Sequence, residues 1–167
     1  NIIDDLFITI SGSTFYQNLH ISELDIPTSL MNQLFNENIV YLNDFINLDT
    51  KNFLYDRLVE KEIKAISKAL DKIAMNYGLI ADKLVKFIQN NNHISNFYLK
   101  DILDNSTYQI VIRNANHCGV KKLGDFTFEN SIKFFKTKGI GKKKLLSLLE
   151  IIFELGEVKF SKRFDLL

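Results

Sequence analysis

The stretch Lys138-Gly139-Ile140-Gly141-Lys142-Lys143-Lys144-Leu145, followed by an apolar run over residues 146–153, joins a tight turn to the start of a helix. The two glycines permit the turn, and the first helical turn after them carries three lysines and no acid. Lysine is locally unfavourable there, because the helix dipole places partial positive charge at that end. Backbone N–H groups at a helix start bind anions readily, so the stretch predicts a phosphate site.

The composition of the chain favours helices. Of the 167 residues, 46% are hydrophobic and 25% are charged, which is typical of a globular protein. One proline and seven glycines are too few for an all-β chain rich in tight turns. We therefore expect an all-α fold, with one short strand over residues 6–10 and a turn after it.

Other sequence-wide features limit the location and the context of the chain. No apolar run approaches the ~18 residues of a membrane-spanning helix, and no segment is organised like a signal peptide. The single Cys118 can form no internal disulfide and fits a reducing interior. We expect a cytoplasmic protein without a membrane partner, and the initial Asn1 indicates a piece of a longer polypeptide.

The charge is divided unevenly along the chain. Residues 1–97 hold 8 Lys/Arg and 12 Asp/Glu, a net charge of −4, whereas residues 98–167 hold 13 and 8, a net charge of +5. Six lysines and no carboxylate lie between Glu129 and Glu150. The asymmetry predicts an anionic partner for the C-terminal half, and a solvated lysine face is the alternative.

Helical periodicity is clearest in the middle of the chain. Residues 56–76 carry apolar side chains at helical spacing, and residues 79–89 resume the pattern after Gly78. Asn90-Asn91-Asn92 then breaks the periodicity, because asparagine favours turns over helix interiors. We place the domain boundary there.

An internal repeat relates the two halves. Residues 39–45 align with residues 120–126 at an offset of 81, and a short amphipathic helix is expected before each. The predicted organisation is two tandem compact five-helix units joined by a helical connector. It comprises an N-terminal extension (1–20), a first unit (21–77), a connecting helix with an Asn-rich linker (78–97), a second unit (98–156) and a C-terminal tail (157–167).

These repeats carry a family likeness. The first opens with Ile21-Ser22-Glu23-Leu24-Asp25-Ile26-Pro27-Thr28 and continues to Leu42-Asn43-Asp44-Phe45. The second matches at its end, through Cys118-Gly119-Val120, Leu123-Gly124-Asp125-Phe126 and the Gly139–Leu145 stretch. Residues 21–156 thus resemble, in tandem, the C-terminal domain of the bacterial RNA polymerase α subunit.

The resemblance implies a helix-hairpin-helix element whose glycines and lysines contact DNA phosphates from the minor-groove side. Gly139, Gly141, Lys142 and Lys143 match that hairpin. The arginine that enters the groove in the family does not carry over, because Ser29 and Ile110 stand in its place. The companion asparagine is kept as Asn32 in the first unit and is replaced by Arg113 in the second.

The first unit departs from the family at its own hairpin, Arg57-Leu58-Val59-Glu60-Lys61-Glu62, which is acidic and lacks glycine. Such a hairpin should not hold a phosphate. Residues 21–77 are therefore expected to serve as a scaffold or a protein-contact module.

Other kinds of site receive little support from the residues. The Gly139 turn lacks the spacing and the preceding strand of a phosphate-binding P-loop. His117-Cys118 has no partner ligands at zinc spacing, and no catalytic Ser/His/Asp or Cys/His pattern occurs. We expect no enzyme activity, metal or cofactor.

The predicted function is non-enzymatic nucleic-acid binding, to double-stranded DNA through backbone phosphates. RNA is a possible ligand as well, and docking of the parent protein onto a partner such as the transcription machinery is the alternative function. The expected binding residues are Lys138, Gly139, Ile140, Gly141, Lys142, Lys143, Lys144 and Arg113.

Overall fold

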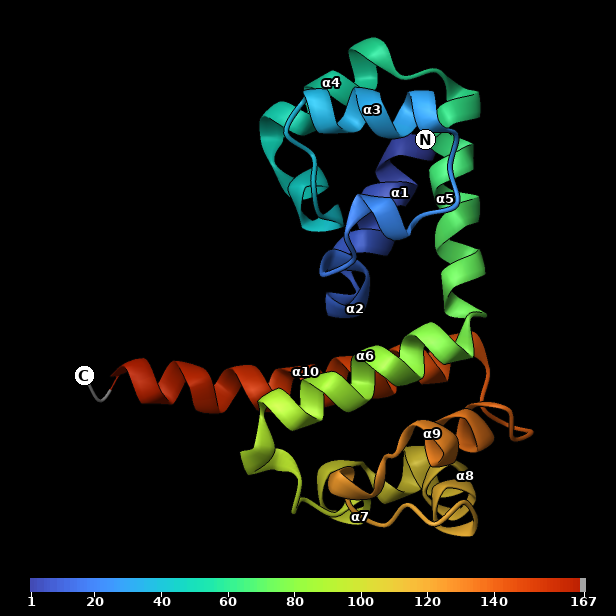
Figure 1. The fold of residues 1–167 in the computed structure, drawn as a ribbon, viewed down its shortest axis with the longest axis vertical. Coiled ribbons are helices and arrows are strands. Elements are labelled where there is room, and N and C mark those ends of the chain that lie inside the picture. Colours follow the sequence, from blue (N-terminus) through green and yellow to red (C-terminus); the bar gives the residue numbers. More distant parts are fainter. Residues whose placement is uncertain (166–167) are drawn as a thin grey trace. The chain divides into compact units, whose positions relative to one another are not determined.

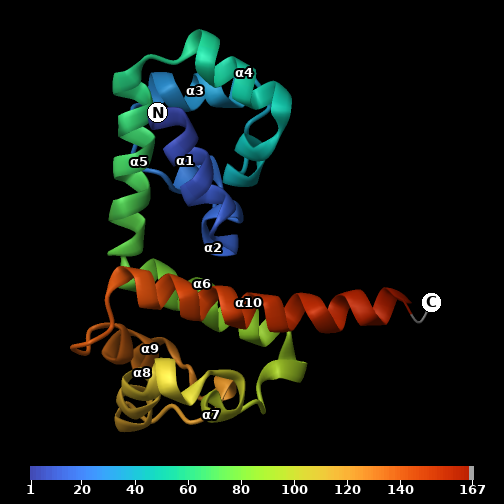
Figure 2. The same ribbon diagram turned by 180° about the vertical axis from the view of Figure 1, so that it is seen from behind.

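The computed structural model describes the backbone of residues 1–165 and the side chains of residues 1–156. In this part of the chain the fold is all-α, as predicted, and the only β-type pairings are two isolated bridges. The chain divides into two compact units, Asn1–Met75 (the N-terminal unit) and Asn76–Leu167 (the C-terminal unit). Figures 1 and 2 show the helices of both.

The N-terminal unit packs around its first helix, which contacts the longest helix, the second helix and a 3-10 turn. Its elements, with 3-10 turns marked η, are α1 (Ile2–Ser11), α2 (Thr14–Gln17), η1 (Ile21–Glu23), α3 (Thr28–Asn36), η2 (Leu42–Ile46), α4 (Leu48–Arg57) and α5 (Glu60–Ala74). Helix α5 buries Ile63, Ile66 and Leu70 on one face, at helical spacing. Helix α1 lies beside α5 in both views and also contacts η2.

The strand predicted over residues 6–10 is wrong, because these residues form the second half of α1. Ile3, Leu6 and Ile10 recur at helical spacing and are buried. The side chain of Asn1 accepts a hydrogen bond from the Asp4 N–H at 2.9 Å and so caps the helix. Burial of this apolar stripe outweighs the strand preference of the local residues.

The C-terminal unit contains a glycine-bearing turn, which we call the hairpin, between its last two helices. Its elements are α6 (Tyr77–Asn90), η3 (Asn92–Ile94), α7 (Leu99–Ile102), α8 (Asn105–His117), η4 (Leu123–Asp125), α9 (Phe128–Phe135) and α10 (Lys142–Asp165). Helix α6 packs on α9, and it runs beside α10 in both views. The rings of Phe87 and Phe153 meet edge to face, with centroids 4.5 Å apart. A Cβ on Gly156 would come within 2.6 Å of the Phe87 ring, so these helices pack closely.

The helical connector and the boundary predicted around residues 78–97 fall inside the C-terminal unit. Asparagine does end α6 at Asn90, but the apolar face of that helix is buried within this unit. The division lies between Met75 and Asn76, whose side chain caps α6 through the Leu79 N–H at 3.1 Å. Likewise, residues 1–20 belong to the packed core of the N-terminal unit rather than to an extension. The predicted tail continues α10 to Asp165, and residues 166–167 lie outside the described part.

The same hydrogen bonds recur in both units. Ile39 donates to the Leu34 carbonyl and Val120 donates to the Ala115 carbonyl, both at 2.9 Å and at the predicted offset of 81. The residue before each donor has positive φ, 63° at Asn38 and 85° at Gly119. The loop carboxylates also correspond: Asp44 accepts from the N–H groups of residues 40 and 41, and Asp125 from those of residues 121 and 122.

The correspondence extends further towards the N-terminus than the sequence indicated. Leu42 donates to the Leu19 carbonyl, and Leu123 donates to the Phe97 carbonyl, each at 2.9 Å. The acceptors are 78 residues apart, so the C-terminal unit has three additional residues in between. At this smaller offset α1 corresponds to α6, and each repeat therefore begins with a helix that the sequence alignment had left out.

Candidate nucleic-acid interface

The hairpin between α9 and α10 is built on Gly139. Its φ is +92°, in the left-handed region that side chains rarely adopt. A Cβ at this position would also lie 3.0 Å from Cγ2 of Ile110 on α8. Glycine is therefore required both by the backbone conformation and by the approach of α8.

The residues after Gly139 anchor the turn and expose the start of α10. Ile140 is only 8% exposed and Leu145 only 2%, so both side chains fix the hairpin to the core. Gly141 accepts the first helical hydrogen bond, from the Leu145 N–H at 3.0 Å. Nothing lies within 4 Å of a Cβ built on Gly141, so a ligand can approach the backbone closely there.

The predicted lysines surround this helix start. Lys138, Lys142 and Lys143 are exposed, and Lys144 is half-buried. The first N–H groups of an α-helix have no acceptor within the helix, and the glycine-rich turn leads directly into them. The predicted hairpin residues therefore form one continuous element. Ile140 differs from the rest in that its side chain points into the core, where it anchors the turn rather than facing a ligand.

Helix α8 supports the hairpin from the side. The Asn114 side-chain amide donates a hydrogen bond to the Lys138 carbonyl oxygen at 2.9 Å. Ile110, one turn earlier on α8, lies against Gly139. Arg113 is exposed on the same turn, next in sequence to Asn114. Asn114 could not be identified from the sequence, because its hydrogen-bond partner lies 24 residues away.

The start of α8 is itself well capped. The Asp104 side chain accepts hydrogen bonds from Thr107 Oγ1 at 2.9 Å and from the Ser106 N–H at 3.1 Å. These hydrogen bonds, that of Thr107 first, lower the pKa of Asp104 below its ordinary value. The carboxylate therefore stays charged at neutral pH and stabilises the first turn of α8, which a kink at Tyr108 (φ −111°, ψ 20°) separates from the segment with Arg113.

The two units differ in charge. Residues 1–75 hold 6 Lys/Arg and 11 Asp/Glu, a net charge of −5, whereas residues 76–167 hold 15 and 9, a net charge of +6. The difference in net charge between the two sides is therefore larger at the observed boundary between the units than at the boundary predicted from sequence. An anion is attracted to the C-terminal unit and repelled by the N-terminal unit.

The hairpin of the N-terminal unit is built differently. Leu58, which is 7% exposed, anchors the turn as Ile140 does, at an offset of 82. The Val59 N–H donates to the Glu62 carboxylate at 3.1 Å, so this helix start is capped by its own acid. At the same offset Glu62 corresponds to Lys144. Ser29 and Asn32 are exposed on α3.

Two other properties of the described residues bear on function. They include no group of three or more His, Cys, Asp or Glu residues placed to hold a metal ion, and Cys118 is half-buried as a free thiol. Over the same residues, no helix combines the length and the apolar character needed to cross a membrane.

Comparisons of the chain with protein-family models, with curated proteins and with solved structures found no match.

Proposed function

We propose that the chain is a nucleic-acid-binding module that grips the phosphate backbone of double-stranded DNA through the hairpin of its C-terminal unit. The observation that carries this proposal is the Gly139 turn. Asn114 and Ile110 hold the turn from α8, and it leads into a helix start with three lysines and no acid. A helix start that exposes N–H groups and adds lysines is suited to an oxygen-rich anion.

Duplex DNA fits this surface better than a small anion does. The lysines of the hairpin are spread along the turn and the helix start, and Arg113 extends the positive charge onto α8. Phosphate contacts hold a duplex without reading its sequence. We therefore expect weak sequence preference and an affinity that falls steeply with salt. The resemblance to the polymerase α-subunit domain supports the same function.

Fluorescence anisotropy of a labelled duplex across a salt series tests the proposal. The test variant changes Lys142, Lys143 and Lys144 together to Gln. A matched control changes Lys61, Lys64 and Lys68 on α5, which removes the same charge from the N-terminal unit. We expect the wild type and the control to bind alike. The hairpin variant should lose affinity and about 0.9 of logarithmic salt slope for each phosphate contact removed.

Each result has a distinct meaning. If the wild type shows no duplex affinity at low salt, DNA binding is rejected. If the hairpin variant binds as the wild type does, binding occurs elsewhere on the chain. A single-stranded RNA of equal length distinguishes RNA from DNA as the ligand, because a phosphate contact alone does not separate them.

The second candidate function is docking onto a protein partner through residues 21–77. Exposed apolar side chains on the N-terminal unit favour it: Leu48 is 74% exposed and Val59 is 60% exposed. The partner would be a component of the machinery that acts on the bound nucleic acid, such as the transcription apparatus. Loss of partner capture on changing Leu48 to Ser, with duplex binding intact, would support this function.

A further inference from the structure

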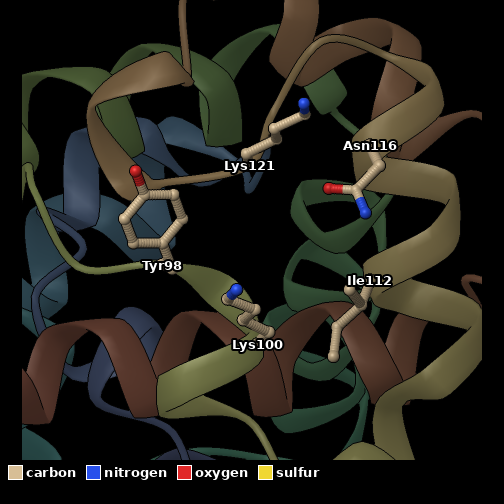
Figure 3. A pocket seen from close by; sticks show the side chains of 5 residues that line it. All are labelled: Tyr98, Lys100, Ile112, Asn116 and Lys121. Atoms are coloured by element: carbon tan, nitrogen blue, oxygen red, sulfur yellow. The ribbon is translucent and has the colours of Figure 1, made fainter.

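A surface depression of about 180 Å³ lies beside α8 in the C-terminal unit. The residues that line it are Tyr98, Lys100, Ile112, Asn116 and Lys121. Figure 3 shows these five side chains around an open space, with Lys100 at its lower edge and Asn116 reaching in from the right, opposite Tyr98. The depression is smaller than the ~300–1,000 Å³ of sites for drug-sized molecules, so it suits a single small group.

The lining is chemically suited to an anion. Lys100 and Lys121 supply positive charge, and the Asn116 amide can donate a hydrogen bond, whereas the Tyr98 ring forms one wall and its hydroxyl points away from the space. The nearby carboxylate of Asp125 already accepts hydrogen bonds from two backbone N–H groups of its own loop. Lys100 Nζ lies 5.6 Å from the centroid of the Tyr98 ring, which holds one cation at the edge of the depression.

The N-terminal unit shows what the same place looks like when it is filled. At the offsets of 78 and 81, Tyr98 corresponds to His20 and Asn116 to Phe35. The His20 and Phe35 rings are in contact, with centroids 5.8 Å apart. The depression is therefore present in the unit that has the small Asn116 side chain at the position where the other unit has the Phe35 ring. It is found in the unit that also carries the basic hairpin.

Helix α8 relates the depression to the hairpin. Ile110 and Asn114 face the hairpin, whereas Ile112 and Asn116 line the depression. Residues two apart on a helix point in nearly opposite directions, so the two sites lie on opposite flanks of α8. Arg113, at an intermediate angle, occupies the exposed ridge between them.

We propose that this depression is a second phosphate site, so that the C-terminal unit holds one nucleic-acid strand at two points on either side of Arg113. A helix with its side chains is about 10–12 Å across. One strand of a duplex presents a phosphate about every 3.4 Å along the axis. Because the strand also winds around the axis, adjacent phosphates are further apart than this rise, and the two sites contact separate phosphates of one strand. This inference rests on the proposed DNA binding.

Three variants test the second site. Changing Lys100 and Lys121 together to Gln removes its charge, and Asn116→Phe fills it with the side chain of the other repeat without changing charge. Changing Lys61 and Lys68 to Gln removes equal charge from the N-terminal unit as a control. All are measured by anisotropy with one labelled duplex between about 50 and 200 mM salt, the range over which phosphate contacts dominate the salt dependence.

We expect the Lys100/Lys121 variant to lose about 1.8 of logarithmic salt slope, two contacts at about 0.9 each. When salt is raised fourfold, the factor by which affinity falls should therefore be about tenfold smaller for the variant than for the wild type. Asn116→Phe should weaken binding at every salt concentration, and the control should match the wild type. A duplex that carries a terminal phosphate, compared with one that ends in a hydroxyl, tells whether the group bound is a strand end or an internal phosphate.

The outcomes separate this inference from the proposed function. If the Lys100/Lys121 variant binds as the control does while the hairpin triple variant is weakened, the second site is rejected and hairpin binding stands. If the wild type binds no duplex, both are rejected. Because Lys100 and Lys121 are exposed, their replacement leaves the core unchanged and the variant remains a valid test even if Asn116→Phe fails to fold.

Discussion

The Asn114 side chain donates a 2.9 Å hydrogen bond to the Lys138 carbonyl, and this bond ties α8 to a hairpin 24 residues further along the chain. Asn114 is half-buried, and its hydrogen bond orders the turn that leads to the proposed phosphate contacts. Positioning of the hairpin therefore depends on a residue outside it.

Replacing Asn114 by Ala should loosen the hairpin. Loss of one neutral hydrogen bond costs about 1 kcal/mol of unfolding free energy. Chemical denaturation measures that cost, and hydrogen exchange at residues 138–141 should show faster local opening. Unchanged exchange at the hairpin, together with unchanged stability, would contradict the assigned role of Asn114.

Gly139 and Gly141 should respond differently to the same substitution. Gly139→Ala forces a side chain into positive φ and against Ile110, so we expect a loss of about 1–3 kcal/mol. A Cβ on Gly141 meets no neighbour, so Gly141→Ala should cost little stability. It should nevertheless weaken duplex binding by obstructing close approach to the backbone. Thermal melts and anisotropy, measured on both variants, separate the two effects.

Tyr16 should make the N-terminal unit sensitive to alkaline pH. Burial raises the pKa of Tyr16 to about 12, and the hydroxyl donates to the Leu70 carbonyl at 3.3 Å. Because the folded pKa lies above the unfolded value of about 10, stability is fully present below pH ~10. It is lost as the pH rises towards 12.

Tyr16→Phe provides the control for that prediction. It removes one hydrogen bond, at a cost of about 0.5–1.5 kcal/mol near neutral pH. It should also flatten the fall in stability between pH 10 and pH 12, as followed by denaturant titration. An equally steep fall in the variant would assign the alkaline transition to other groups.

The close packing of Gly156 and Phe87 should appear as an energetic coupling. Gly156→Ala places a Cβ 2.6 Å from the Phe87 ring, so overpacking should cost about 1–3 kcal/mol. Phe87→Leu removes the atoms that would clash. In a double-mutant cycle the combined variant should be more stable than the sum of the single effects predicts. Simple additivity would show that the helices separate readily at this point.

The helical fold and the turn at Gly139 could be predicted from sequence because their signals are local. The apolar spacing of α5 and the Gly-Ile-Gly-Lys turn each lie within a few residues. The error at residues 6–10 has the opposite cause. Five apolar or β-branched residues in a row favour a strand locally, and only packing of α1 against α5 and η2 decides for a helix.

The boundary and the depression could not be predicted, because both depend on contacts between distant segments. The Asn90–Asn92 break ends a helix as expected, yet α6 is held in the C-terminal unit by α9 and α10. The depression brings together residues 98, 112 and 121, which no sequence spacing relates. A comparison of the repeats identifies it only after the two offsets are known.

The Glu62 cap has a consequence for stoichiometry. A carboxylate of the chain already serves as the anion at the start of α5, where the Val59 N–H donates to it. The corresponding position of α10 carries Lys144. The start of α5 is therefore neutralised by an acid of the chain itself, whereas the start of α10 carries a positive charge at the same position. If duplex binding is confined to the C-terminal hairpin, as proposed, a protein made of two related units is functionally monovalent. Titration should saturate at one duplex per chain, and excess protein should not bridge two duplexes through a single molecule.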